Sequence, residues 1–400
     1  MAIPTRLLVF FALLSLIVVG GHLYLYRRLF RDTGRSPLWR RTGAILLGVL
    51  GASLILSRPL MALAPSAAMS AFAQGSWYWM GVAAYLLLTM LAVGGARSLA
   101  GWIGRRRAAP AAPVGNAAPV SEERREFLAR AGAGVALVAT GGITTHGTWR
   151  AFHPPVVNEV AVKLPGLPRA LDGITIVQLS DIHVGPLIRR RFMDELVART
   201  NDLKGDLVCI TGDLVDGSVG ELGHAAAALR ELRSRFGMYF CTGNHEYYSG
   251  DQEWTEALTR MGVTVLRNRH VRVGDAGASF DLVGVDDWGA ARSGYPERGY
   301  DLSAALAGRD PTRASVLLAH QPAGWREQAQ KAGMGLQLSG HTHGGQMFPF
   351  TLAVSAIWEH DAGFFREGEH SLYVSRGTGF WGPPVRVAAP PEIVKVTLLA

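Results

Sequence analysis

Long apolar runs separated by arginine-rich segments fill the first part of the chain. Residues 7–26 form twenty nearly uncharged positions, the length that a helix needs to cross the hydrocarbon core of a membrane. Three more apolar runs follow at 42–64, 77–96 and 129–147. We therefore expect residues 1–150 to form an all-α membrane anchor of about four transmembrane helices.

A different pattern begins near Asn158. Short apolar runs of strand length alternate with amphipathic runs of helical spacing, which is typical of a layered α/β domain. Strands are expected at 174–179, 207–210, 238–241, 281–285, 314–319, 335–338, 372–375 and 393–399. Helices are expected at 189–203, 223–236 and 251–262. Residues 151–400 are therefore expected to form one α/β domain.

The charged residues are distributed unevenly. Residues 1–150 hold sixteen arginines, no lysine and four acidic residues, whereas the rest of the chain holds 24 basic and 28 acidic residues. The arginines flank apolar runs without interleaved aromatic residues, so no nucleic-acid partner is expected. By the positive-inside rule, loops 27–41 and 97–130 lie in the cytoplasm. The chain is then a multi-pass protein of the cytoplasmic (inner) membrane, with residues 151–400 on the extracytoplasmic, periplasmic side.

Two interpretations of the segment before the fourth apolar run stay open. Residues 108–120 have the Ala/Pro-rich composition of a cytoplasmic linker. The segment Arg124-Arg125-Glu126-Phe127-Leu128 resembles a twin-arginine export signal, and an ordinary span with positive cytoplasmic flanks explains it equally well. Both interpretations give the same orientation.

Polar side chains repeatedly follow the predicted strands. They are Asp181, His183, Asp213, Asn244, His245, His320, His341 and His343. The carboxyl ends of strands are where an α/β sheet gathers its site. Mixed nitrogen and oxygen donors suit Mn, Fe, Co or Zn better than Mg or Ca. Seven such donors, with His245 beside them, exceed one tetrahedral shell, so we expect two divalent metal ions.

The order of these motifs resembles that of the calcineurin-like metallophosphoesterases. The motifs are Asp181-Ile182-His183, Gly212-Asp213, Gly243-Asn244-His245-Glu246, His320 and Gly340-His341-Thr342-His343. The segments LSDIHVG, TGDLVDG, GNHEYY and SGHTHGGQ are similar to the bacterial membrane-associated YkuE/YaeI-like branch. The resemblance covers about 155–400 and implies a four-layer α-β-β-α sandwich. It does not cover the apolar N-terminal region.

The resemblance also implies a role for each motif residue. One metal ion is expected on Asp181, His183 and His343, and the other on Asn244, His320 and His341. Asp213 is expected to bridge the two ions, which would share the attacking hydroxide. His245 is expected to face the phosphate, where it stabilises charge or protonates the leaving oxygen.

These expectations favour a membrane-anchored di-metal phosphoesterase. Its substrate would be a phosphodiester, pyrophosphate or phosphomonoester, with lipid head groups as candidates. One alternative is a non-catalytic metal-binding or scaffold protein of the same fold, against which the intact ligand set argues. Another is a nucleotide phosphodiesterase with its domain in the cytoplasm.

Three neighbouring residues have less specific expectations. Asp216 is expected to cap a helix or a loop. Glu246 either orients a neighbour or faces solvent. His360 lies with Trp358 and Asp361 after the last ligand pair, where a substrate would rest.

Overall fold

The computed structural model describes residues 5–63, 66–107 and 121–400. The predicted linker at 108–120 lies outside these described residues. The chain divides into two compact units, Met1–His146 and Gly147–Ala400.

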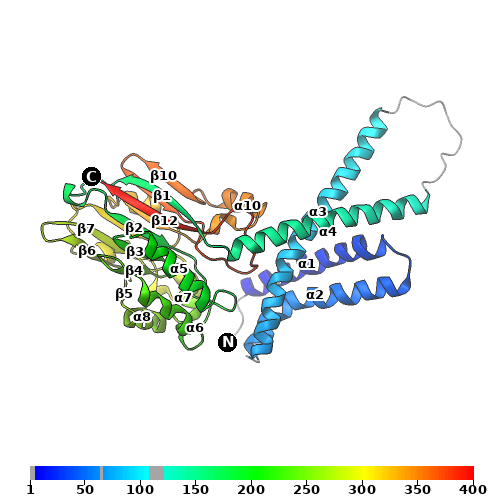
Figure 1. Ribbon diagram of the computed structural model, residues 1–400, viewed down its shortest axis with the longest axis horizontal. Coiled ribbons are helices and arrows are strands. Elements are labelled where there is room, and N and C mark those ends of the chain that lie inside the picture. Colours follow the sequence, from blue (N-terminus) through cyan, green and yellow to red (C-terminus); the bar gives the residue numbers. More distant parts are fainter. Residues whose placement is uncertain (1–4, 64–65, 108–120) are drawn as a thin grey trace. The chain divides into compact units, whose positions relative to one another are not determined.

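The first unit contains four long apolar helices (Figure 1). Their bounds are α1 Thr5–Tyr26, α2 Pro37–Leu63, α3 Ala67–Arg107 and α4 Glu122–Phe152, with a short helix at Arg27–Arg31. All four are long and apolar enough to cross a membrane. This confirms the predicted helical region. Both α3 and α4 continue beyond the apolar runs at 77–96 and 129–147: α3 begins in the uncharged segment at Ala67 and ends at Arg107, and α4 begins at Glu122 and ends at Phe152.

Hydrogen bonds between side chains link these apolar helices. The Trp79 indole donates to Nε2 of His22 (3.0 Å), and Nδ1 of His22 donates to the Val18 carbonyl (2.8 Å). The hydroxyls of Thr89 and Thr140 lie 2.8 Å apart. Polar groups in a lipid-facing bundle need such internal partners. These two hydrogen bonds account for a histidine within an apolar helix, so His22 has a structural role.

The second unit is built on two six-stranded mixed sheets (Figure 1). The first has the order β1 Val156–Lys163, β12 Glu392–Leu399, β2 Thr175–Leu179, β3 Leu207–Thr211, β4 Met238–Cys241 and β5 Val263–Val265. The second has the order β10 Gly363–Glu367, β11 His370–Val374, β9 Leu336–Ser339, β8 Ser315–Leu318, β7 Ala278–Gly284 and β6 Arg269–Asp275. Strands β2 to β5 are parallel to one another, as are β7, β8, β9 and β11.

Three apolar clusters define four layers. One cluster joins the inner faces of the two sheets, for example Ile176 with Leu338. A second packs the outer face of the first sheet on α5 Arg190–Asp202, α6 Val219–Ala226 and α8 Asp251–Arg260. The third covers the second sheet with α9 Leu302–Leu306 and the turn around Trp325. The predicted four-layer α/β class is confirmed.

The helix predicted at 223–236 is wrong in its bounds. The structure places α6 at Val219–Ala226, followed by a 3-10 helix at Ala227–Glu231. The helix starts early because Ser218 and Glu221 form a capping box, in which the Ser218 N–H donates to Glu221.

The end of α4 belongs to the second unit. Ala151 is fully buried in its core, and the ring of Phe152 meets Phe380 edge-on with centroids 5.0 Å apart. The backbone N–H of Arg386 donates to the Gly147 carbonyl (2.9 Å). The last turns of the fourth apolar helix are thus an element of the α/β unit.

Candidate metal centre

The motif residues follow five strands that lie side by side in the two sheets. Asp181 and His183 follow β2, and Asp213 follows β3. Asn244 and His245 open α7 Asn244–Ser249 after β4. His320 follows β8, while His341 and His343 follow β9. Neighbouring parallel strands present their carboxyl ends at one edge, so the topology gathers these side chains there.

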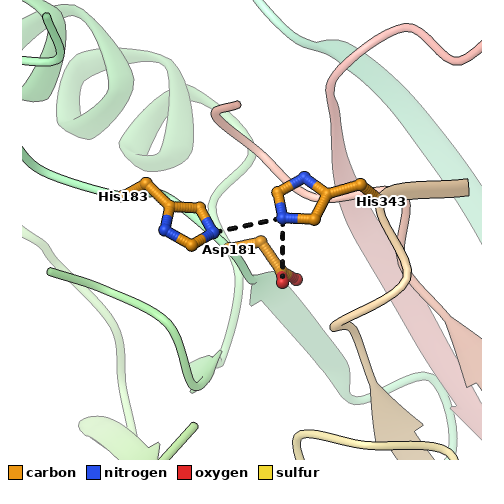
Figure 2. A group of neighbouring side chains, drawn as sticks. All are labelled: Asp181, His183 and His343. Carbon is orange, nitrogen blue, oxygen red and sulfur yellow. Dashed lines mark hydrogen bonds and ion pairs between the residues drawn. The ribbon is translucent and has the colours of Figure 1, made fainter. Parts of the chain in front are cut away.

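One group contains Asp181, His183 and His343 (Figure 2). The Nε2 atoms of His183 and His343 lie 3.1 Å apart, and Nε2 of His343 lies 3.5 Å from Oδ1 of Asp181. In Figure 2 the two rings and the carboxylate point toward one another, with Asp181 and His183 on one segment and His343 on another. Two imidazole nitrogens and one carboxylate directed at a common point form a donor set for a divalent transition metal.

A second group contains Asp213, His320 and His341. Nε2 of His320 lies 3.1 Å from Oδ2 of Asp213 and 3.3 Å from Nδ1 of His341. Nε2 of His183 lies 3.9 Å from the same Asp213 oxygen. Asp213 is therefore close to a histidine of each group, as a bridging carboxylate must be.

The side chain of Asn244 tests whether these residues fit a metal. Its Oδ1 atom is buried and has no hydrogen-bond partner among the described residues. A buried amide oxygen without a partner costs about 1–3 kcal/mol. A cation beside Asp213 and the histidines would supply that partner. The donor set and this unpaired oxygen therefore fit a divalent metal pair.

His245 also lies close to this cluster, and its surroundings resemble those of a ligand. Its Nε2 lies 4.0 Å from Oδ2 of Asp213, and it could hold a metal with His183 and Asp213. The side chain is 15 % exposed, compared with 11 % for His343 and 0 % for His320. The ring of His245 is thus within reach of a substrate.

The backbone at the ligand positions is strained. Nine non-glycine residues in the described part of the chain have positive φ, and five of them are expected ligands. These five are Asp181, His183, Asp213, His341 and His343. A left-handed conformation is costly for residues with a Cβ and concentrates at functional sites. This geometry supports a site whose ligands are held in place before metal binding.

Two glycines allow the close approach of the ligand loops. A methyl group at Gly340 would collide with the Asp181 carboxylate, and one at Gly243 would collide with that of Asp213. The His341 N–H, next to Gly340, donates to Oδ1 of Asp181 (2.9 Å). The glycines flanking the motifs are therefore required by packing of one loop on another.

Asp216 does not cap a helix or a loop, so that expectation is wrong. Its Oδ1 accepts hydrogen bonds from Nδ1 of His183 (3.0 Å) and Nδ1 of His245 (2.5 Å). Because Asp216 takes the Nδ1 protons, Nε2 of both rings faces the centre. His320 is oriented in the same way, since its Nδ1 donates to the Thr211 carbonyl (2.8 Å).

Glu246 is buried and organises the Asp213 loop. Its carboxylate accepts the backbone N–H groups of Gly243 (2.6 Å), Asp213 (3.0 Å) and Leu214 (2.8 Å). Burial raises the pKa of Glu246 to about 7, and the negative charge of Asp213 acts in the same direction. Glu246 orients its neighbours, and the alternative that it faces solvent is wrong.

The sequence analysis did not include Arg386. This buried side chain donates to the His343 carbonyl (3.0 Å) and the Arg376 carbonyl (2.8 Å), and its Nη2 donates to Nδ1 of His343 (3.0 Å). Burial and the positive charge of Arg386 hold the pKa of His343 well below its usual range. His343 is thus kept uncharged in the structure, with Nδ1 accepting from Arg386 and the ring proton on Nε2. The sequence analysis missed Arg386 because this residue lies outside all of the motifs.

The two aspartates differ electrostatically. Burial raises the pKa of Asp181, and the nearby Asp213 carboxylate adds to this effect. Burial also acts to raise the pKa of Asp213, but the charges of His320 and His245 hold it well below its usual range. A cation between the carboxylates would remove their mutual repulsion.

His360 and Trp358 line a small cavity beside the centre. The cavity has a volume of about 140 Å³ and is bounded also by the segment 322–327. The ring of Trp358 lies 5.3 Å from that of His341, whereas His360 packs edge-on against Trp325 and Phe365. Aromatic packing accounts for the position of His360. Trp358 lies between this cavity and the expected ligand His341.

Replacing Asp216 with alanine is expected to weaken metal binding by about 10- to 100-fold, because His183 and His245 lose the group that fixes their orientation. Metal titration of the purified full-length protein measures this effect. Asp194→Ala removes an exposed carboxylate that pairs with Arg190 and serves as the control. Equal metal affinity in the two variants would contradict the role of Asp216.

A two-sheet α/β fold with Asp, Asn and His donors gathered at the strand ends is characteristic of metal-dependent phosphoesterases. Residues 174–345 match the family model described as calcineurin-like phosphoesterase. The chain belongs to the calcineurin-like metallophosphoesterases.

Curated relatives support membership of this family, and they differ in how much of their own length the match covers. A transmembrane protein with metallophosphoesterase domain from Danio rerio is 40 % identical over 66 % of this chain and 62 % of that protein. The uncharacterized metallophosphoesterase YkuE of Bacillus subtilis is 32 % identical over 69 % of this chain and 97 % of that protein. A metallophosphoesterase of Aquifex aeolicus is 35 % identical over 60 % of this chain and 91 % of that protein. The match thus spans about three fifths of the transmembrane relative and nearly all of YkuE.

Proposed function

We propose that this protein is a membrane-anchored phosphoesterase that uses two divalent metal ions of the Mn, Fe, Zn or Co type. Three histidine–aspartate groups and, beside His245 in the chain, the buried, unpaired Oδ1 of Asn244 carry this proposal. Its neighbourhood combines nitrogen and oxygen donors, which suit these metals.

The ligands divide between two sites. Asp181, His183 and His343 would hold one ion, and Asn244, His320 and His341 the other, with Asp213 shared between them. Two cations held there would neutralise phosphate charge and acidify a water molecule. The orienting residues Asp216, Glu246 and Arg386 would keep the donors in position.

His245 would act on the substrate. Burial alone would lower its pKa, but the charges of Asp213 and Asp216 and the hydrogen bond to Asp216 raise it to about 9. Nearby cations would bring this pKa back toward neutrality, the range that favours a general acid. With Nδ1 bonded to Asp216, the proton available to the leaving oxygen is on Nε2.

The proposed substrate class rests on the four membrane-length helices. A protein with four membrane-length helices meets lipid phosphates at high local concentration. We therefore favour phosphodiester or pyrophosphate bonds of lipid head groups over phosphomonoesters. Hydrolysis by the full-length protein of a chromogenic diester, a chromogenic monoester and a lipid panel, each with Mn, Zn and Fe, tests this choice. Absence of hydrolysis under all metals would favour the scaffold alternative.

The α/β unit is expected on the extracytoplasmic side. Arginines in the loops 27–41 and 97–130 set this orientation by the positive-inside rule. Alkaline phosphatase fused after Ala400 should be active in cells, and a fluorescent protein that matures only in the cytoplasm should stay dark at the same position. The reverse pattern would support the cytoplasmic nucleotide phosphodiesterase.

A further inference from the structure

An uncharged helix lies on the surface beside the metal centre. No charged residue occurs from Gly344 to Trp358, and this segment contains α10 Phe350–Ile357. Phe350, Leu352 and Ile357 are 63 %, 62 % and 76 % exposed, and Val354 is the buried residue of the helix. At 3.6 residues per turn, Phe350 and Ile357 point in similar directions and Leu352 points away from them, so the helix exposes apolar side chains on more than one side. Soluble surfaces rarely expose large apolar side chains in this way, which indicates an apolar environment for the helix.

Both ends of α10 are connected to metal-ligand segments. The helix begins seven positions after His343, and Thr351 packs so closely on Gly345 that a side chain there would collide with it. After the helix, the ring of Trp358 lies against His341, with centroids 5.3 Å apart. A molecule bound along α10 would therefore have its polar end within reach of the metal centre.

The start of α10 also lies near the last turns of the fourth apolar helix. Gln346 and Phe348 both hydrogen-bond to Val387, at 2.9 and 3.0 Å. The preceding residue, Arg386, donates its backbone N–H to the Gly147 carbonyl at 2.9 Å. Gly147 and the segment at Gln346 are thus separated by two spacings between hydrogen-bonded chains, which amount to roughly 10 Å. The candidate span Glu122–Phe152 thus ends in the same part of the α/β unit as α10.

An exposed tryptophan is hydrogen-bonded to the segment that leads into α10. Trp381 is 49 % exposed, and its backbone is held by Gln346, whose amide donates to the Trp381 carbonyl (3.0 Å). The rings of Trp381 and His245 lie 5.6 Å apart. Tryptophan and phenylalanine next to an uncharged helix are typical of segments that lie in the lipid–water interface.

We propose that Phe350, Leu352 and Ile357 of α10, together with Trp381, insert into the lipid–water interface, so that the metal centre receives its phosphate group from a lipid of that bilayer. The second half of this proposal rests on the proposed phosphoesterase function. The insertion of α10 is argued only from the exposure of its side chains and from its connections to the rest of the chain.

Fluorescence quenching in the full-length protein tests the insertion. The single-cysteine positions are introduced by Leu352→Cys and, in a second variant, by Ile357→Cys. Each variant is labelled with an environment-sensitive dye and placed in nanodiscs of phosphatidylcholine and phosphatidylglycerol. The native Cys209 and Cys241 are fully buried. Ser303→Cys on α9 is the exposed, uncharged control. Nitroxide-labelled lipids should quench the two α10 positions several-fold more than position 303.

Two other outcomes would overturn the insertion. Quenching of positions 352 and 357 by aqueous iodide, without quenching by nitroxide lipid, would place α10 in water. Protection from both quenchers would mean that protein covers the helix, either a second copy or another part of this chain.

Substrate presentation is tested with the double variant Leu352→Asn and Ile357→Asn. Its rate on a phospholipid diester in bilayers should fall about tenfold, since two large apolar side chains lose their transfer free energy. Its rate on soluble bis(p-nitrophenyl) phosphate should change less than about twofold, because neither residue contacts a ligand. Equal losses on both substrates would overturn substrate presentation. Failure of the unmodified protein on both substrates would instead refute the phosphoesterase proposal, and the quenching result would still decide the insertion.

Discussion

Asp213→Asn is expected to release most bound metal and to abolish nearly all hydrolysis. Oδ2 of Asp213 lies 3.1 Å from His320 and 3.9 Å from His183, so one carboxylate serves both histidine groups. A neutral amide of the same shape cannot neutralise two cations. Removing one charged partner from a buried site costs about 3–5 kcal/mol, or roughly two to four powers of ten in metal affinity.

Elemental analysis after gel filtration measures the bound metal in this variant. Asp202→Asn provides the matched control, because Asp202 is an exposed residue at the end of α5. The control should keep the metal content and rate of the unmodified protein. Two equivalents of metal in an active Asp213→Asn protein would refute the bridging assignment.

His245→Ala is expected to retain both metal ions and to lose about 10²- to 10⁴-fold in turnover, the usual contribution of a general acid. Nδ1 of His245 is held by Asp216, and its ring is partly exposed. The remaining donors keep their partners when this ring is removed. The loss should be smaller for substrates with good leaving groups, which depart without a proton.

A series of aryl phosphodiesters of graded leaving-group pKa measures this dependence. His224→Ala on α6 removes an exposed histidine outside the centre and should leave both rate and metal content unchanged. An equal loss across the whole series would show that His245 stabilises charge and does not transfer a proton. Loss of metal would show that His245 is a ligand.

The strands that could be predicted are those in the interior of the sheets. Each of the eight predicted runs overlaps an observed strand, from β2 to β12. The four strands without a predicted run, β1, β5, β6 and β10, are the edges of the two sheets. Interior parallel strands are buried on both faces and therefore form continuous apolar runs. Edge strands such as Arg269–Asp275 carry charged and half-exposed residues, which hide the pattern.

In the candidate site, the sequence indicated the expected metal ligands and not the residues that orient them. The expected metal ligands follow directly on interior strands, and the structure brings their aspartates and histidines into one cluster. The residues that orient them were not predicted in that role. Asp216 contacts His183 and His245 across 33 and 29 positions of sequence, and Arg386 contacts His343 across 43. Contacts over such separations depend on the fold, and no local spacing indicates them.

The continuity of α4 affects how firmly the α/β unit stays joined to the apolar helices. Exposed segments without regular structure are the preferred sites of proteolytic cleavage. Here Gly147–Phe152 is helical, with Ala151 fully buried and Phe152 packed on Phe380. A protease would have to unwind this helix and disturb the core of the α/β unit before cutting. We therefore expect limited proteolysis to leave this junction intact, without release of a separate α/β unit.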